Sequence, residues 1–411
     1  MMFDAQKQIA PTELGARLAI ARRNRNLSQE EVASKLGVSR PTYISIEKGS
    51  RTIKPAELDL LSNLFSRSVH ELVSQREFIA DFAPQFRITQ SSEVSMEAVT
   101  SSVNKFQRAC EDYLTLETLV EAPMPRYSYP EPYSHGALSQ SAAAEEAATL
   151  ERSRLNLGLG PISNLFEVLE NEAGLRVFAL PLSDFKIAGM FVYTDRLGGC
   201  ILVNGQHPTT RQVWTLAHEY AHFVSDRFKD ELTILIEYER RPRSEQFADA
   251  FAANFLMPSS GLRRRFLRIF QSRKDFTVAD LCLLADQYGV SVEAMTRRLE
   301  GMTCIRKGAW EELAAEGFRS SRLRTHLSLG ARQVVRHRFP DRYLRLAIQA
   351  FENELITESE LMRVLHCSRV EARETVDALT QSTEVAQSGK MYQLDLNFGD
   401  TLGLASEERV A

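Results

Sequence analysis

The chain has 411 residues, and its 50 lysines and arginines face 54 aspartates and glutamates, for a net charge of −4. This length predicts two to four domains of roughly 100–200 residues each, and 44% hydrophobic residues is typical of globular proteins. No uncharged apolar run approaches the roughly 18 residues of a membrane-spanning helix, which argues against an integral membrane protein. Residues 1–11 lack the pattern of a secretory signal, and the five scattered cysteines form no CxxC pair. We therefore expect a cytoplasmic protein with no disulfide framework, no thiolate zinc site and no membrane partner.

Residues 12–74 predict a compact bundle of short helices. Ser28 and Glu31 have the spacing of a capping box, and Gly37 predicts a left-handed stop after the apolar positions end. Ser39 is the predicted cap of the following helix, which runs to about residue 48. Ten basic residues against seven acidic ones give this segment a net charge of +3 in a negative chain, which favours binding to phosphates.

The run LSQEEVASKLGVSRPTYISIEKG at residues 27–49 closely resembles the helix-turn-helix of the XRE, or lambda-repressor-like, family. The resemblance implies that residues 10–75 form a DNA-binding domain whose partner is a double-stranded operator. It further implies one contact to a phosphate and three to base edges in the major groove. The phosphate contact is assigned to Gln29, and the base contacts to Arg40, Thr42 and Ser45.

Two alternatives to these DNA contacts stay open. In the first, the polar side chains of the helix face solvent and contact no base. In the second, the module is a helical interaction domain that has lost DNA binding. Glu47, near the end of the same run, is interpreted as structural. Because a single module of this kind binds DNA weakly, we expect a homodimer on an operator with two-fold symmetry.

Residues 76–150 predict a helical connector followed by a linker. The stretch 76–121 has helical character, whereas residues 122–132 contain four prolines, which no regular element tolerates. Residues 139–148 are rich in alanine, serine and glutamate, and they predict a solvated helix or a linker. The boundary to the next domain is therefore expected within residues 122–150.

Residues 151–300 combine β-rich runs with amphipathic helices. After a helix that ends near Gly174, periodicity predicts three short strands and two long helices. The strands are expected at residues 175–180, 187–193 and 200–203, and the helices at 209–225 and 243–257. Residues 276–300 predict two short helices that mimic a second helix-turn-helix, which we interpret as the helical end of this domain, where a substrate could be held.

The first long helix carries the sequence His218-Glu-Tyr-Ala-His222. Two histidines at positions i and i+4 lie one turn apart on one helical face, so both imidazoles can reach a single zinc ion. The intervening Glu219 is rotated by about 100° and can take the proton of a zinc-activated water that attacks a carbonyl. This HExxH arrangement predicts a catalytic metal site with Glu219 as its base.

A catalytic zinc site needs a third protein ligand. Glu245 opens the second long helix and is the leading candidate, with Glu237, Glu239 and Asp249 as competitors. Asp249 shares a helical face with Glu245, and we expect it to hydrogen-bond the outer nitrogen of a ligating histidine and fix its tautomer. A surface salt bridge would leave the same pattern at Asp249. The expected cofactor is Zn²⁺, although two histidines and a glutamate also accept Mn²⁺.

Three segments together resemble the ImmA/IrrE-type metallopeptidases, with the resemblance covering about residues 155–300. They read GCILVN at 199–204, RQVWTLAHE at 211–219 and EQFADAFAANFLMP at 245–258. The resemblance implies that His218, His222 and Glu245 bind zinc and that Glu219 is the catalytic base. It also implies a protein substrate, since the known substrates of the family are helix-turn-helix repressors whose cleavage induces phage, mobile-element or stress genes.

This sequence departs from the family pattern only modestly, with Phe255 where a leucine is usual. The group that stabilises the oxyanion is not assigned by the resemblance, and Tyr193, His207 and Tyr238 are candidates. Two groups of arginines either extend a DNA surface or form a solvated face. They are Arg263, Arg264, Arg265 and Arg268, and the arginines between residues 319 and 345.

The sequence thus predicts an α+β fold class that is mostly α. A helix-turn-helix bundle is followed by a zincin-like metallopeptidase domain at residues 151–300 and a helical C-terminal domain at residues 301–411. The last of these is expected to sense a signal or mediate assembly. The predicted function is a DNA-binding regulator with a zinc endopeptidase, which either cleaves a separate repressor or is placed at an operator by its own helix-turn-helix. The alternative is a transcription factor whose peptidase-like domain senses a ligand or protein without catalysis.

Overall fold

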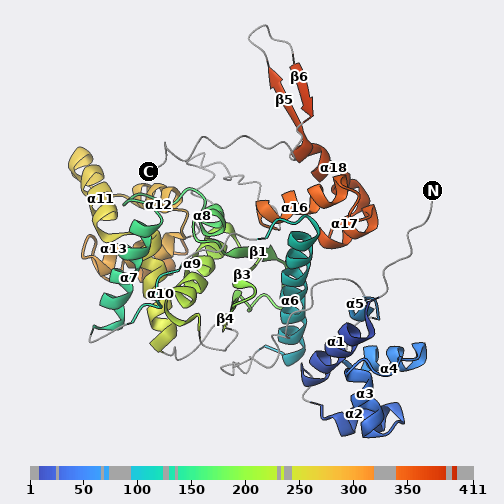
Figure 1. Cartoon of the computed structure of the whole chain (residues 1–411). Coiled ribbons are helices and arrows are strands. Elements are labelled where there is room, and N and C mark those ends of the chain that lie inside the picture. The colour runs from blue at the N-terminus through green and yellow to red at the C-terminus, as the bar shows by residue number, and fades with distance from the viewer. Residues whose placement is uncertain are drawn as a thin grey trace, which may run out of the picture. The chain divides into compact units, whose positions relative to one another are not determined.

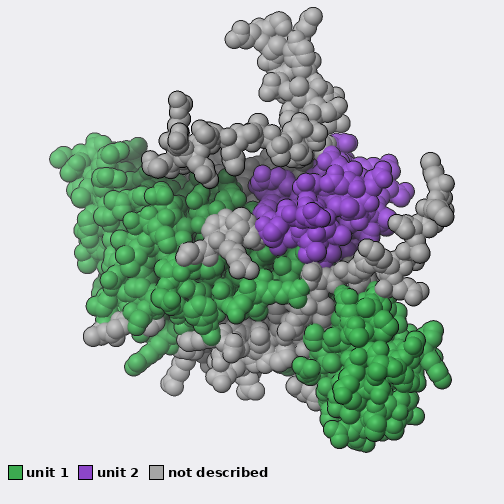
Figure 2. Space-filling model, in the orientation of Figure 1, with its two compact units in different colours: residues 1–114, 124–340 green, residues 115–123, 341–411 purple. Residues whose placement is uncertain are grey.

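The structure is a computed structural model that describes residues 9–24, 27–65, 69–73, 94–123, 129–134, 138–228, 233–235, 243–318, 339–385 and 391–395. These residues are mostly helical and include one small mixed sheet (Figure 1). The chain divides into two compact units, residues 1–114 with 124–340 and residues 115–123 with 341–411 (Figure 2). The predicted helix over residues 76–93 and the arginines at 319–338 lie outside the described residues. In the described part, no helix is both long and apolar enough to cross a membrane.

Five short helices form the N-terminal bundle around an apolar core of their own. They are α1 (Pro11–Asn24), α2 (Gln29–Leu36), α3 (Arg40–Glu47), α4 (Pro55–Phe65) and α5 (Val69–Val73). The predicted capping box is confirmed, because the Glu31 amide donates to the Ser28 hydroxyl and the Ser28 amide donates to the Glu31 carboxylate. Gly37 ends α2 with a φ of 67°, a left-handed conformation that glycine adopts without steric cost.

A long helix, α6 (Met96–Leu119), and then α7 (Gln140–Arg154) precede the sheet. The predicted helix at residues 139–148 is present, but the prediction that it is solvated is wrong for one of its faces. Ala143, Ala144, Ala147 and Ala148 are buried, and α7 packs against α10 (Arg243–Leu256) in the main core. Alanines at these spacings form one face of small residues. This face lets α7 and α10 approach closely, although each alanine buries only a small apolar area.

The sheet has the strand order β1-β3-β2-β4. β1 (Arg176–Leu180) pairs in parallel with β3 (Gly198–Asn204), while β2 (Gly189–Thr194) is antiparallel to both β3 and β4 (Thr233–Leu235). The three predicted strands are therefore confirmed. The fourth was not predicted, because three residues carry too little periodicity.

One helix, α9 (Thr209–Asp226), covers the sheet, and α10 packs on α9. α9 packs on β2 and β3, and α10 packs against both α9 and α7. Phe251 and Phe255 of α10 contact the ring of Tyr220 on α9, which locks the two helices together in the core. The remaining helices of this unit are α8 (Leu165–Asn171), α11 (Ser259–Arg273), α12 (Val278–Tyr288), α13 (Val292–Gly301) and α14 (Ala309–Ala315).

The second unit contains α16 (Asp341–Glu352), α17 (Glu358–Val364) and α18 (Arg369–Thr380), as the prediction of a helical C-terminus requires. Within it, Arg342 donates to the Glu117 carboxylate at 2.5 Å and to the Ala122 carbonyl at 2.6 Å. An antiparallel hairpin of β5 (Gln381–Val385) and β6 (Met391–Asp395) follows α18. This hairpin was not predicted, because the sequence reading extended helix to near the C-terminus.

Candidate metal centre and DNA-binding module

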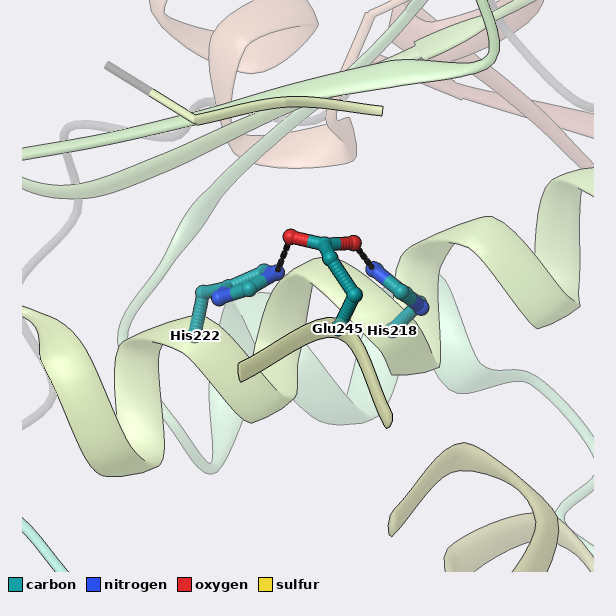
Figure 3. A group of neighbouring side chains, drawn as sticks. All are labelled: His218, His222 and Glu245. Atoms are coloured by element: carbon teal, nitrogen blue, oxygen red, sulfur yellow. Dashed lines mark hydrogen bonds and ion pairs between the residues drawn. The ribbon is translucent and has the colours of Figure 1, made fainter. Parts of the chain in front are cut away.

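α9 and α10 bring the three predicted metal ligands together. His218 and His222 lie one turn apart on α9, with ring centroids 5.2 Å apart, and Glu245 comes from the first turn of α10. The Glu245 carboxylate lies between the two imidazoles (Figure 3), with Oε2 3.0 Å from His218 Nε2 and Oε1 3.4 Å from His222 Nε2. All three residues are buried, and one ligand atom from each lies within 4.8 Å of the others.

The donor set fits a divalent transition metal. Two imidazole nitrogens and one carboxylate are the protein ligands of many catalytic zinc sites, which keep a fourth position open. Among the described residues, neither carboxylate oxygen of Glu219 has a hydrogen-bond partner, although both are buried. The buried Nε2 atom of His222 likewise makes no hydrogen bond there and has the ion pair with Glu245 at 3.4 Å. Because buried polar atoms are nearly always paired, this cluster is suited to a ligand.

A carboxylate stands behind His218. The Nδ1 atom of His218 lies 3.0 Å from Asp249 Oδ1, so Nδ1 donates its proton and Nε2 faces the Glu245 side. This is the contact that the sequence predicts for Asp249. Such a contact fixes the imidazole tautomer and makes the ligand nitrogen more basic.

A second carboxylate stands behind His222, and the sequence reading missed it. The His222 Nδ1 atom lies 3.7 Å from Asp226 Oδ2, and the Asp226 side chain is 16% exposed. Asp226 is four residues after His222 on α9, so the same i, i+4 rule that links the two histidines could have found it. Each imidazole therefore has its own acidic residue on the side away from Glu245.

Burial and the close approach of imidazoles and carboxylates shift the pKa values in the cluster. Burial raises the pKa of the Glu219 carboxyl to about 7, although the imidazoles of His222 and His218 oppose this. Burial would lower the pKa of His222, but Asp226 and Glu245 raise it to about 10. Glu245 has a pKa well below its usual range because the two histidines outweigh its burial. The imidazole of His222 is thus protonated beside the carboxylate of Glu245, and metal binding would release its proton.

The backbone of β2 leaves room for the Glu219 carboxylate. A Cβ atom at Gly189 would lie 3.2 Å from Glu219 Oε1 and only 2.5 Å from the Thr215 Cγ2 atom. Any side chain at this position would therefore push α9 away from the sheet. Gly189 is a close-approach glycine that lets strand and metal helix meet.

Two of the three oxyanion candidates have contacts with other residues in the described part of the chain. The His207 Nε2 atom is bonded to the Phe185 carbonyl at 2.7 Å, and the Tyr193 ring packs against Phe223 and Phe228. The third candidate, Tyr238, lies outside the described residues, as do the competing ligands Glu237 and Glu239.

The proposed base-contacting residues all lie on α3. The Arg40 side chain is 58% exposed and reaches within 4.0 Å of Glu30. The Thr42 and Ser39 hydroxyls are hydrogen-bonded at 2.7 Å, and the Ser45 hydroxyl donates to the Pro41 carbonyl at 3.0 Å. Arg40 is therefore the candidate whose side chain is most exposed for a contact with a base. The hydroxyls of Thr42 and Ser45 already make hydrogen bonds at or within their own helix.

Gln29 is hydrogen-bonded within the bundle. Its Nε2 atom donates to Glu47 Oε2 at 2.7 Å, and Arg22 donates to Glu47 Oε1 at 2.6 Å. Glu47 thereby joins α1, α2 and the end of α3, which agrees with its structural interpretation. Gln29 is held at the N-terminus of α2, where a phosphate contact is favourable.

Comparisons with known proteins fit both parts of the chain. Residues 18–72 match the helix-turn-helix family model, and residues 170–300 match the model of the IrrE N-terminal-like domain. The chain joins an XRE-type helix-turn-helix domain to an IrrE-like domain. Both resemblances drawn from the sequence are thus confirmed, and the His-His-Glu cluster lies within the IrrE-like domain.

Two individual proteins are similar to this chain. The cryptic phage CTXphi transcriptional repressor RstR of Vibrio cholerae is 40% identical over 53 residues, which cover 13% of this chain and 48% of the repressor. The match therefore spans about half the length of that relative. The crystal structure of ComR from Streptococcus suis aligns over 90% of this chain and 93% of its own, at 12% identity. Its TM-score of 0.15 supports no conclusion about the fold.

Proposed function

We propose that this chain is a DNA-binding transcriptional regulator whose IrrE-like domain is a metal-dependent endopeptidase. The observation that carries the proposal is the buried carboxylate of Glu219, which has no hydrogen-bond partner among the described residues and lies beside the ligand atoms of His218, His222 and Glu245. A structural helix gains nothing from burying an unpaired carboxylate, whereas a hydrolytic site needs one.

Each residue of the cluster has one role in this proposal. His218, His222 and Glu245 would hold Zn²⁺ or Mn²⁺, with Asp249 and Asp226 orienting the imidazoles. The bound metal would supply Lewis-acid polarisation of the peptide carbonyl. Glu219 would accept a proton from the attacking water and return it to the departing amine nitrogen, which balances the hydrolysis of one peptide bond.

The proposed substrate is a helix-turn-helix repressor, in a cytoplasmic setting. The match of the catalytic part to the IrrE-like family supports this class of substrate. The N-terminal domain would bind a double-stranded operator, with the chain as a homodimer. Its excess of positive charge and the exposed Arg40 support DNA binding.

The test incubates the metal-loaded chain with purified helix-turn-helix repressors from the same genome and follows their cleavage by gel electrophoresis and mass spectrometry. Glu219→Gln should keep bound metal, because the ligands stay, yet lower the cleavage rate about 10²–10⁴-fold. Glu172→Gln, an exposed change in the same domain, is the matched control and should cleave at the wild-type rate. If metal-loaded wild type cuts no faster than Glu219→Gln, the IrrE-like domain is a sensor and the endopeptidase proposal is wrong.

A further inference from the structure

One helix of the IrrE-like unit carries a strongly basic stretch that the proposed peptidase does not use. Residues 259–274, which include all of α11, contain six cationic side chains and no acidic one. They are Arg263, Arg264, Arg265, Arg268, Arg273 and Lys274. In the described residues around it, Arg273 is paired with Asp280 at 2.8 Å.

The central arginines of α11 have no carboxylate partner among the described residues. Arg264 and Arg268 are exposed and make no hydrogen bond or ion pair there. Arg263 donates to the Met302 carbonyl at 2.9 Å, and Arg265 to the Gln287 side chain at 3.0 Å. Their positive charges are therefore uncompensated, unlike those of Arg297 and Arg306, which pair with glutamates of α13 and α14.

Three of these arginines line a surface pocket. Its volume is about 300 Å³, and its lining residues are Arg264, Arg265, Arg268, Ile269 and Gln287. The Arg265 guanidinium lies over the ring of Tyr288, 5.6 Å from the centroid, so its direction is fixed by α12. Part of the basic surface is thus held in place before any ligand arrives.

From this arrangement we infer that the arginine face of α11 binds the phosphate backbone of duplex DNA. Guanidinium groups match phosphates in a two-pronged geometry, and a side-chain amide beside them suits a sugar-phosphate contact. Arg264 and Arg268 are one turn apart, so they can reach neighbouring phosphates. The IrrE-like domain would therefore add its own sequence-independent contact to DNA that the N-terminal domain selects.

The test measures binding of the full chain to a mixed-sequence 30-base-pair duplex by fluorescence anisotropy across a series of salt concentrations. Arg264→Gln with Arg268→Gln removes two unpaired charges and no hydrogen bond among the described residues. The slope of log K against log salt should fall by about 1.8, since each phosphate contact contributes roughly 0.9. Affinity at low salt should fall roughly tenfold.

The matched control is Arg297→Gln with Arg306→Gln, which changes the net charge equally but removes paired arginines. Its slope should equal that of the wild type. Arg40→Ala in the same series reports on the N-terminal domain, so failure of that DNA contact is seen separately. Equal slopes for the α11 variant and the control would overturn the inference. Weakened binding of poly-L-glutamate at an unchanged DNA slope would assign the face to an acidic protein, and would equally contradict it.

Discussion

Asp249 and Asp226 show how single residues can tune the candidate metal site. Each carboxylate lies on the outer side of one imidazole, at 3.0 Å from His218 and 3.7 Å from His222. A carboxylate there favours the tautomer whose other nitrogen is free to bind metal. Because the Asp249 contact is the shorter one, we expect it to contribute more to metal affinity.

Asp249→Asn should weaken Zn²⁺ binding by about 10–100-fold, and Asp226→Asn should weaken it by less. The reason is that an amide cannot accept the imidazole proton with the strength of a carboxylate. Competition with a coloured zinc chelator measures this without any need for a substrate. Asp275→Asn, an exposed change beyond α11, should leave affinity unchanged. Wild-type affinity in both site variants would show that these carboxylates do not orient the ligands.

At this scale, local spacing made much of the site predictable. His218, Glu219 and His222 follow from one helical turn, and Asp226 obeys the same rule although it was overlooked. The choice of Glu245 over other acidic residues depends on how α10 packs against α9, and no local pattern encodes that packing. The partners of Ser45 and Thr42 were equally hidden, because a hydroxyl can turn back onto its own helix.

At the scale of elements, the site depends on the contact between strand β2 and helix α9. Gly189 sits where any Cβ would collide with Thr215, 2.5 Å away, and would crowd Glu219. Since both neighbours belong to α9, the strand controls the position of the proposed base. Burial of α7 behind α10 supports the same helices from the other side.

Gly189→Ala should lower the free energy of unfolding by about 1–3 kcal/mol, because the added methyl overpacks the interface between β2 and α9. Cleavage should decline further than stability alone explains, since Glu219 would be displaced. Chemical denaturation and the cleavage assay measure the two effects. Gly160→Ala, where no atom lies within 4 Å of the new Cβ, is the control and should be close to neutral. A Gly189→Ala protein as stable as this control would refute the close-approach role.

Element types were predictable where the pattern is long or capped, as in α2, α9 and α10. The errors have physical causes. α7 was misread because its buried face is made of alanine, whose small apolar area resembles that of a solvated helix. Strands of three to five residues, such as β4 and β5, contain too few alternations to separate from neighbouring helix or loop.

At the scale of the whole molecule, the net charge of −4 is the sum of basic and acidic segments. The helix-turn-helix segment carries an excess of +3, and α11 contains five arginines and no acidic residue. Both domain families could be recognised from sequence because their motifs are local and dense. The domain limits and the role of the C-terminal region stay predictions, since they depend on contacts between segments far apart in the chain.

The central claim is that the IrrE-like domain cleaves protein with a metal held by His218, His222 and Glu245. The most direct measurement is the cleavage rate of helix-turn-helix repressors from the same genome before chelation, after 1,10-phenanthroline, and after addition of Zn²⁺ or Mn²⁺. We expect wild type to lose its activity on chelation and regain it with metal, and Glu219→Gln to stay inactive throughout. Cleavage that persists after the metal is removed, or that Glu219→Gln performs at the wild-type rate, would contradict the account.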